Sequence, residues 1–222
     1  MDGMEAEDIG ARRRVKVIRA RREFQARITL WYPAPMEIRP GNAKDLDLLS
    51  DIDGTIESTR YLHLEQSAGE GLAVSWRLEE RALREKVIDP NRLTDEAAFL
   101  VKQIVTGADE GLVFVAEHES APVAVLVAHR RPELNTLHIV DLRIDYEQRR
   151  QGIATAMLYQ TIGVAREMEV RAVSAETRTN NVPASQLLAK CGFELSGVDT
   201  RRHSNHDVVK EAATLFWYAA LD

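Results

Sequence analysis

Residues 137–165 constrain the fold more than any other stretch of this 222-residue chain. They open with the run 138–144, which is mostly apolar and β-branched and therefore predicts a strand. A short polar turn follows. A helix is then expected from Ile153 onward, because apolar residues recur there at spacings of three and four. The stretch thus predicts a strand, a tight loop and a helix in direct succession.

The loop between this strand and this helix has the chemistry of an anion site. The first turn of a helix presents unpaired N–H donors and the positive end of the helix dipole. Gly152 and Ala154 leave room for an anion at the main chain, and Arg149 and Arg150 add positive charge. Such a turn can hold a pyrophosphate. The residues alone leave an alternative to the anion site open. In that alternative Gly152 only forms a turn, and the two arginines are solvated.

Two motifs in the C-terminal half resemble those of the GNAT acetyltransferase superfamily. Residues 149–154 are similar to its Arg/Gln-x-x-Gly-x-Gly/Ala signature, and residues 181–193 are similar to its pattern of Asn-x-x-Ala followed by Gly-Phe. The resemblance covers residues 111–222. It implies an α+β fold (α/β three-layer), in which a mixed, mostly antiparallel sheet is flanked by helices. It also implies transfer of an acetyl group from acetyl-CoA to a primary amine of a small molecule.

Four segments look most similar to the streptothricin acetyltransferases within that superfamily, namely residues 176–184, 189–193, 197–199 and 211–218. This resemblance implies a streptothricin-like antibiotic as the amine and antibiotic resistance as the role. Two other functions stay open. One is a catalytically weak acyl-CoA-binding sensor or interaction module, and the other is a protein or peptide N-acetyltransferase.

The resemblance also implies which residues contact acetyl-CoA. Main-chain groups of the strand end would pair with the pantetheine arm, and N–H groups of the loop would bind the pyrophosphate. Asn181 would contact the cofactor, although capping of the following helix is an equally good role for it. The expected cofactor-binding residues are Leu142, Arg143, Ile144, Arg149, Arg150, Gln151, Gly152, Ile153, Ala154, Thr155 and Asn181. No metal is expected.

His138 is the candidate general base that would deprotonate the amine. It lies eleven residues before Arg149, where several members of the superfamily have a Glu or a His, and an imidazole titrates near neutral pH. Strand alternation places His138, Val140 and Leu142 on one face, with Asp141 facing the other way. The alternative is a half-buried structural histidine.

The sequence departs from the superfamily at Leu188, where many members have a tyrosine that is thought to protonate the leaving thiolate. Solvent or another group would then act as the acid; Tyr146, Tyr159 and Tyr218 are the candidates. Cys191, the one cysteine, is expected to pack in the interior. Because the chain has a single cysteine, an internal disulfide and a cysteine-based metal cluster are excluded.

Bulk composition favours a cytoplasmic, soluble protein with one domain and an extension. No apolar run approaches the roughly 20 residues that a transmembrane helix needs, and the acidic start lacks the features of a signal peptide. The net charge of −6 argues against nucleic acid as a partner. We expect an N-terminal extension at 1–35, partly disordered and with a basic arm at 12–22, and a catalytic domain at 36–222. A homodimer is neither indicated nor excluded.

Periodicity and turn residues predict the remaining elements. Helices are expected at 43–53, 94–105 and 181–190, and part of 57–89 is expected to be extended and to line a substrate site. Further strands are expected at 36–39, 112–117, 123–129, 172–176, 193–199 and 213–218.

Overall fold

A computed structural model describes residues 28–31, 35–68, 71 and 73–221 of the chain. The basic arm expected at 12–22 lies outside these residues, so it stays a prediction. The described elements are β1 (Ile28–Trp31), β2 (Pro35–Pro40), η1 (Leu49–Asp51), β3 (Ile56–Ala68), β4 (Val74–Asp89), α2 (Asp95–Thr106), β5 (Gly111–His118), β6 (Ala121–Arg131), η2 (Pro132–Leu134), β7 (Thr136–Ile144), η3 (Tyr146–Gln148), α3 (Ile153–Glu167), β8 (Ala172–Arg178), α4 (Val182–Lys190), β9 (Glu194–Asp199) and β10 (Thr214–Ala220).

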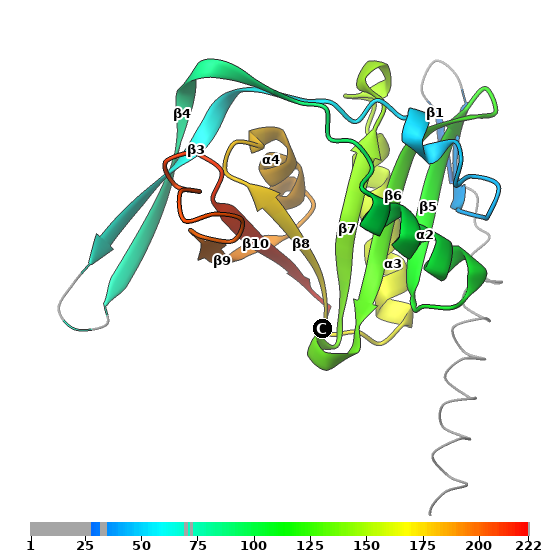
Figure 1. The fold of residues 1–222 in the computed structure, drawn as a ribbon. Helices are drawn as coiled ribbons and strands as arrows, with labels where there is room; N and C mark the ends of the chain where they lie inside the picture. The colour runs from blue at the N-terminus through cyan, green and yellow to red at the C-terminus, as the bar shows by residue number, and fades with distance from the viewer. Residues whose placement is uncertain (1–27, 32–34, 69–70, 72, 222) are drawn as a thin grey trace, which may run out of the picture.

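Eight of these strands form one sheet, in the order β1-β2-β5-β6-β7-β8-β10-β9 (Figure 1). All neighbouring strands pair antiparallel except β7 and β8, which run parallel. A parallel pair needs a crossover connection, and α3 provides it. The expected mixed, mostly antiparallel sheet is therefore confirmed. Strand β1 pairs with β2, so the sheet begins before residue 36.

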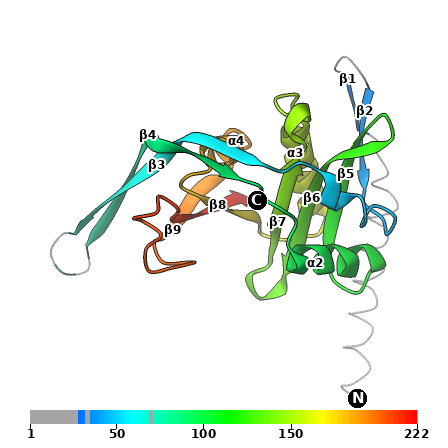
Figure 2. The same cartoon turned by 45° about the horizontal axis from the view of Figure 1, so that its top comes forward.

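Helices cover both faces of the sheet (Figures 1 and 2). On one face, Val101 and Ile104 of α2 pack in a cluster with alternate residues of β5 and β6. On the other face, Met157 of α3 and Leu188 of α4 belong to the larger core cluster. The expected arrangement of a sheet flanked by helices is confirmed. No helix of the described part of the chain is long and apolar enough to cross a membrane.

Local capping explains where two of the predicted helices begin and end. The side chain of Thr94 accepts a hydrogen bond from Ala97 N, and Gly107 ends α2 in the left-handed conformation with φ +79°. Asn181 caps α4 in the same way, by accepting from Ala184 N. Side-chain caps of this kind satisfy N–H groups that have no partner inside the helix. The expected helices at 94–105 and 181–190 are confirmed within a residue or two.

The helix expected at 43–53 is wrong. The chain there makes turns, followed by the single 3-10 turn η1. The reason lies in Asp45, whose carboxylate accepts from Asn42 N at 2.7 Å and from two nitrogens of Arg39 at 2.9 and 2.7 Å. A short acidic side chain that binds nearby groups in this way holds the backbone in a turn and competes with the helix. Leu49 and Ile52 are buried nonetheless.

Strands β3 and β4 form a separate two-stranded hairpin that projects from the main sheet (Figure 1). This confirms the expectation of extended structure within 57–89, although the pairing runs almost the whole length of the segment. Leu62 N donates to Thr179 O at 2.8 Å, and Leu62 and Leu78 pack against the main core. These contacts hold the middle of the hairpin beside the residue that follows β8.

A β-bulge in β7 changes which side chains share a face. Ile139 lies opposite Ala128 and Asp141 lies opposite Val127, so Val140 is the extra residue. Before the bulge Ile139 faces the α3 core, and after it Leu142 does. The expectation that His138 and Leu142 share a face, with Asp141 facing the other way, is therefore wrong, because the bulge places Asp141 on the face of His138. Simple alternation fails here because a bulge adds one residue to the period of two.

Candidate functional site

The first turn of α3 is open to an anion. Gly152 is the N-cap residue of α3, and no side chain caps this helix. Its φ of +83° is a conformation that glycine adopts readily, and a Cβ built on it meets nothing within 4 Å. Open space therefore lies above N–H groups that have no partner inside the helix. This geometry has room for an anion such as the pyrophosphate of acetyl-CoA, and the cofactor-binding role of 149–154 stays a prediction.

The two arginines of the loop differ in their contacts. Arg149 donates from Nε and Nη2 to Ile144 O, both at 3.2 Å, and its guanidinium lies 5.0 Å from the centre of the Tyr146 ring. Arg149 therefore ties the loop to the end of β7. Arg150 is exposed and has a φ of +64°, so the backbone is left-handed at both Arg150 and Gly152. Thr155 contacts the thiol of Cys191 across to the end of α4.

The split between β7 and β8 could receive the pantetheine arm. The parallel ladder ends at the pair Ile139–Ala175, although both strands continue (Figure 1). Within the described part of the chain, no strand pairs with this edge of β7 beyond Ile139. The main chain at Leu142 and Arg143 thus has no strand partner on this side among the described residues, and its contact with the pantetheine arm stays a prediction. At Ile144 the carbonyl already accepts from Arg149.

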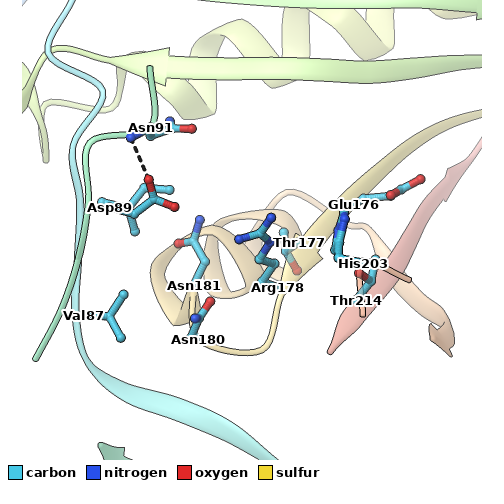
Figure 3. A pocket seen from close by; sticks show the side chains of 11 residues that line it. Val87, Asp89, Asn91, Glu176, Thr177, Arg178, Asn180, Asn181, His203 and Thr214 are labelled. Atoms are coloured by element: carbon cyan, nitrogen blue, oxygen red, sulfur yellow. Dashed lines mark hydrogen bonds between the residues drawn. The ribbon is translucent and has the colours of Figure 1, made fainter. Parts of the chain in front are cut away.

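A pocket of about 290 Å³ opens between the base of the β3–β4 hairpin and the C-terminal end of β8 (Figure 3). This is the small end of the range for small-molecule sites, about 300–1,000 Å³. Its polar lining includes the carboxylates of Asp89 and Glu176, the amides of Asn91 and Asn181, and Arg178. Carboxylates attract an ammonium group, so the pocket suits an amine. The expectation that part of 57–89 lines a site agrees with this position of β4.

His138 lies buried behind Glu176. Its side chain is 8% exposed, its Nδ1 is 3.0 Å from Ser174 Oγ, and its Nε2 is 3.9 Å from Glu176 Oε1. Burial first, and then the positive charges of Arg131, His129 and Arg202, lower the pKa of His138 to about 4. The imidazole is therefore neutral at pH 7, and its contact with Glu176 is not an ion pair.

Glu176 lies in the candidate site, although the sequence provided no reason to place it there. It lines the pocket and approaches His138, so it connects the predicted base with the space where an amine could bind. The strand at 172–176 was predicted, and alternation along it places Glu176 on the face of Ser174. What the sequence could not show is that this face meets Asp89 from a hairpin nearly 90 residues earlier.

Several of the other residues singled out from the sequence cap a helix, pack in the core or make a hydrogen bond. The side chain of Asn181 caps α4, so its capping role is confirmed, while cofactor contact stays a prediction. Leu188 is 4% exposed in the main core, and Cys191 is buried in the same cluster, as expected. Burial raises the pKa of the Cys191 thiol, which keeps it protonated. The Tyr146 hydroxyl donates to Glu57 at 3.1 Å.

A buried ion pair lies on β7 beneath the pocket. Arg143 Nη2 is 3.1 Å from Asp141 Oδ2, and the two side chains are 3% and 12% exposed. Burial raises the pKa of Asp141, and the charge of Arg143 opposes that shift. The stem of Arg143 also packs under Gly54, whose carbonyl accepts from Asn91 of the pocket wall. The ion pair therefore supports both β7 and the pocket.

Replacing Arg143 with Met should destabilise the protein by roughly 3 kcal/mol, because Asp141 would remain buried without its partner. Urea unfolding at pH 7 measures the difference. The double variant Asp141→Asn/Arg143→Met should recover much of the loss, since it leaves no buried charge. A single variant as stable as the wild type would contradict the assignment of a structural ion pair.

Comparison with known proteins agrees with this geometry. The model of the acetyltransferase (GNAT) family matches residues 76–193, more than half of the chain. The streptothricin acetyltransferase of Escherichia coli is 33% identical over 81 residues, which cover 36% of this chain and 45% of that protein. Streptothricin acetyltransferase A of Bacillus subtilis (strain 168) is 34% identical over 80 residues, which cover 36% of this chain and 46% of that protein. The matched segment thus spans somewhat less than half of each of these two relatives.

A solved structure shows the same fold over most of the chain. It is a Bacillus anthracis str. Ames protein assigned as a streptothricin acetyltransferase, in complex with acetyl coenzyme A. The TM-score is 0.66 at 19% identity, over 84% of this chain and 98% of that one. The fold, the two sequence motifs and the family match agree, and the chain belongs to the GNAT acetyltransferase family.

Proposed function

We propose that this protein transfers the acetyl group of acetyl-CoA to a primary amine of a small molecule, with a streptothricin-like antibiotic as the first acceptor to test. Family membership supports the reaction, and the E. coli and B. subtilis relatives support the acceptor class. The pocket supports an amine through the carboxylates of Asp89 and Glu176, in a lining that also contains Arg178.

One observation carries the proposal, namely that a hydrogen bond ties the segment just before the loop 149–154 to the hairpin whose base lines the pocket. Tyr146, just before the loop, donates to Glu57 of β3. Glu57 lies opposite Ile88, and the two neighbours of Ile88 on β4, Val87 and Asp89, line the pocket. When the pyrophosphate is held at the turn and the pantetheine arm lies along β7, the thioester would meet an amine held in the pocket near the β7–β8 split. Such positioning supplies much of the rate of a two-substrate reaction.

Acetyl transfer needs a neutral amine. Its nitrogen forms a bond to the thioester carbon, the carbon–sulfur bond breaks, and CoA leaves as a thiolate that takes up a proton. In our proposal, the neutral imidazole of His138 accepts the proton of the reacting amine, directly or through water. The N–H groups of 150–155 bind the pyrophosphate, and the free edge of β7 binds the pantetheine arm.

Release of CoA from acetyl-CoA by the purified full chain tests this function. The panel contains streptothricin, polyamines, aminoglycosides and amino acids. Turnover with streptothricin would support the proposal in full, and turnover with another small amine would change only the acceptor. If acetyl-CoA raises the melting temperature but no acceptor is turned over, the sensor or the peptide enzyme is favoured. The absence of any thermal shift would refute the acetyl-CoA site itself.

A further inference from the structure

Arg202 occupies a position in which a carboxylate and an aromatic ring meet. It lies just after β9, and its Nη2 donates to both carboxylate oxygens of Glu176, at 3.1 and 3.3 Å. Its guanidinium also lies 5.7 Å from the centre of the Phe216 ring. Glu176 and Phe216 are directly paired residues of β8 and β10, so their side chains are neighbours on one face of the sheet.

A carboxylate beside an aromatic face recognises organic cations. The carboxylate accepts charge-assisted hydrogen bonds, and the negative face of the ring attracts the same positive charge. The chain's own guanidinium, bound to both groups, shows that these two side chains can hold a cation together.

This cation position opens on the pocket. Glu176 lines the pocket, and so does Thr214, two residues before Phe216 on the same face of β10 (Figure 3). The Thr214 side chain is buried, and its hydroxyl has no hydrogen-bond partner among the described residues. The Arg202 side chain is 42% exposed, so water can solvate its guanidinium once a ligand displaces it from Glu176.

We propose that Glu176 and Phe216 form a cation-binding subsite of the acceptor pocket, and that Arg202 is its resident occupant, which a cationic group of the acceptor displaces. This inference rests on the proposed function. It also narrows the acceptor class. An amine paired with a carboxylate is held in its charged form, whereas the amine that is acetylated must be neutral. The acceptor therefore carries at least two basic groups, one that anchors at Glu176 and one that reacts.

Binding of streptothricin in the absence of acetyl-CoA tests the subsite by isothermal titration calorimetry. Arg202→Gln removes the guanidinium that competes with the ligand for Glu176, so binding should become tighter. The gain should be only about fivefold, because the exposed ion pair that is lost is weak. Glu176→Gln should weaken binding at least tenfold. The double variant should bind like Glu176→Gln alone, because Arg202 then has no carboxylate to block.

Arg201→Gln is the matched control. It removes the same charge from the neighbouring position, and Arg201 is exposed, with its backbone N–H bound to Asp199. If Arg201→Gln tightens binding as much as Arg202→Gln does, the effect is general electrostatics and the proposal is overturned. Equal affinities of wild type and Arg202→Gln also overturn it. Melting temperatures and the acetyl-CoA thermal shift verify folding, and if Glu176→Gln does not fold, the comparison of the two arginine variants decides.

The readout separates this inference from the proposed function. Streptothricin that binds as predicted but is not acetylated, with no other amine of the panel turned over, would support the subsite and refute the reaction. Turnover without any difference between the two arginine variants would support the reaction and refute the subsite. An Arg202→Gln protein that binds neither streptothricin nor spermidine would show that Glu176 and Phe216 do not form a cation site.

Discussion

Gly152→Glu should reduce the affinity for acetyl-CoA at least a hundredfold. The carboxylate would enter the open space above the first turn of α3, where it would compete with the pyrophosphate for the same N–H groups and repel its charge. The backbone cost is modest. A left-handed φ of +83° costs a non-glycine residue roughly 1–2 kcal/mol, so the variant should still fold. The acetyl-CoA thermal shift and calorimetric titration measure the loss.

Gly107→Glu is the control for strain and charge. Gly107 has nearly the same φ, +79°, and a Cβ there also meets nothing within 4 Å, but it ends α2, away from the loop 149–154. This variant should lose stability and keep its acetyl-CoA affinity. Gly152→Ala should fall between the two, because it adds the strain without the charge. An unchanged affinity in Gly152→Glu would remove the loop from the cofactor site.

The sequence allowed this prediction because the relevant physics is local. A strand, a loop and a helix that follow one another within 30 residues are set by periodicity and by one glycine. The caps at Thr94 and Asn181 are local in the same sense, since each side chain binds an N–H three residues away. Elements of this kind were predicted almost to the residue.

The acceptor side could not be predicted in the same way. The extra residue at Val140 shifts the alternation of side chains along β7. No residue type in that strand predicts a bulge. The pocket combines Asp89 from the hairpin with Glu176 and Thr214 from two strands of the main sheet. Each of these residues is unremarkable in its own segment. Only the tertiary arrangement shows that their side chains meet, and the same holds for Arg202 over Phe216.

Acidification from pH 7.5 to 5 should destabilise the wild type by about 2 kcal/mol more than it destabilises His138→Gln. The cause is the buried imidazole, whose pKa falls from 6.5 to about 4 on folding. Below pH 6.5 the unfolded chain takes up this proton while the folded chain does not. The stabilising effect of the neutral histidine is therefore complete above pH 6.5 and is lost progressively as the pH falls toward 4. Urea unfolding at the two pH values measures it.

His206→Gln controls for the removal of one imidazole, because His206 is exposed in the loop before β10. Its variant should keep the acid sensitivity of the wild type. The groups around His138 that could share the effect are Glu176, Arg131, His129 and Arg202. If His138→Gln has the same pH dependence as the wild type, the imidazole is not the group that confers the acid sensitivity.

The His138→Gln variant also tests the proposed catalytic role of His138. Loss of a general base should lower turnover about a hundredfold and leave acetyl-CoA affinity intact. Because the imidazole stays neutral well above its lowered pKa, the ratio of wild-type to variant rates should be constant from pH 6 to 9. A ratio that changes around pH 6.5 would mean that His138 titrates as a solvated imidazole. Equal rates would show that His138 is not the general base.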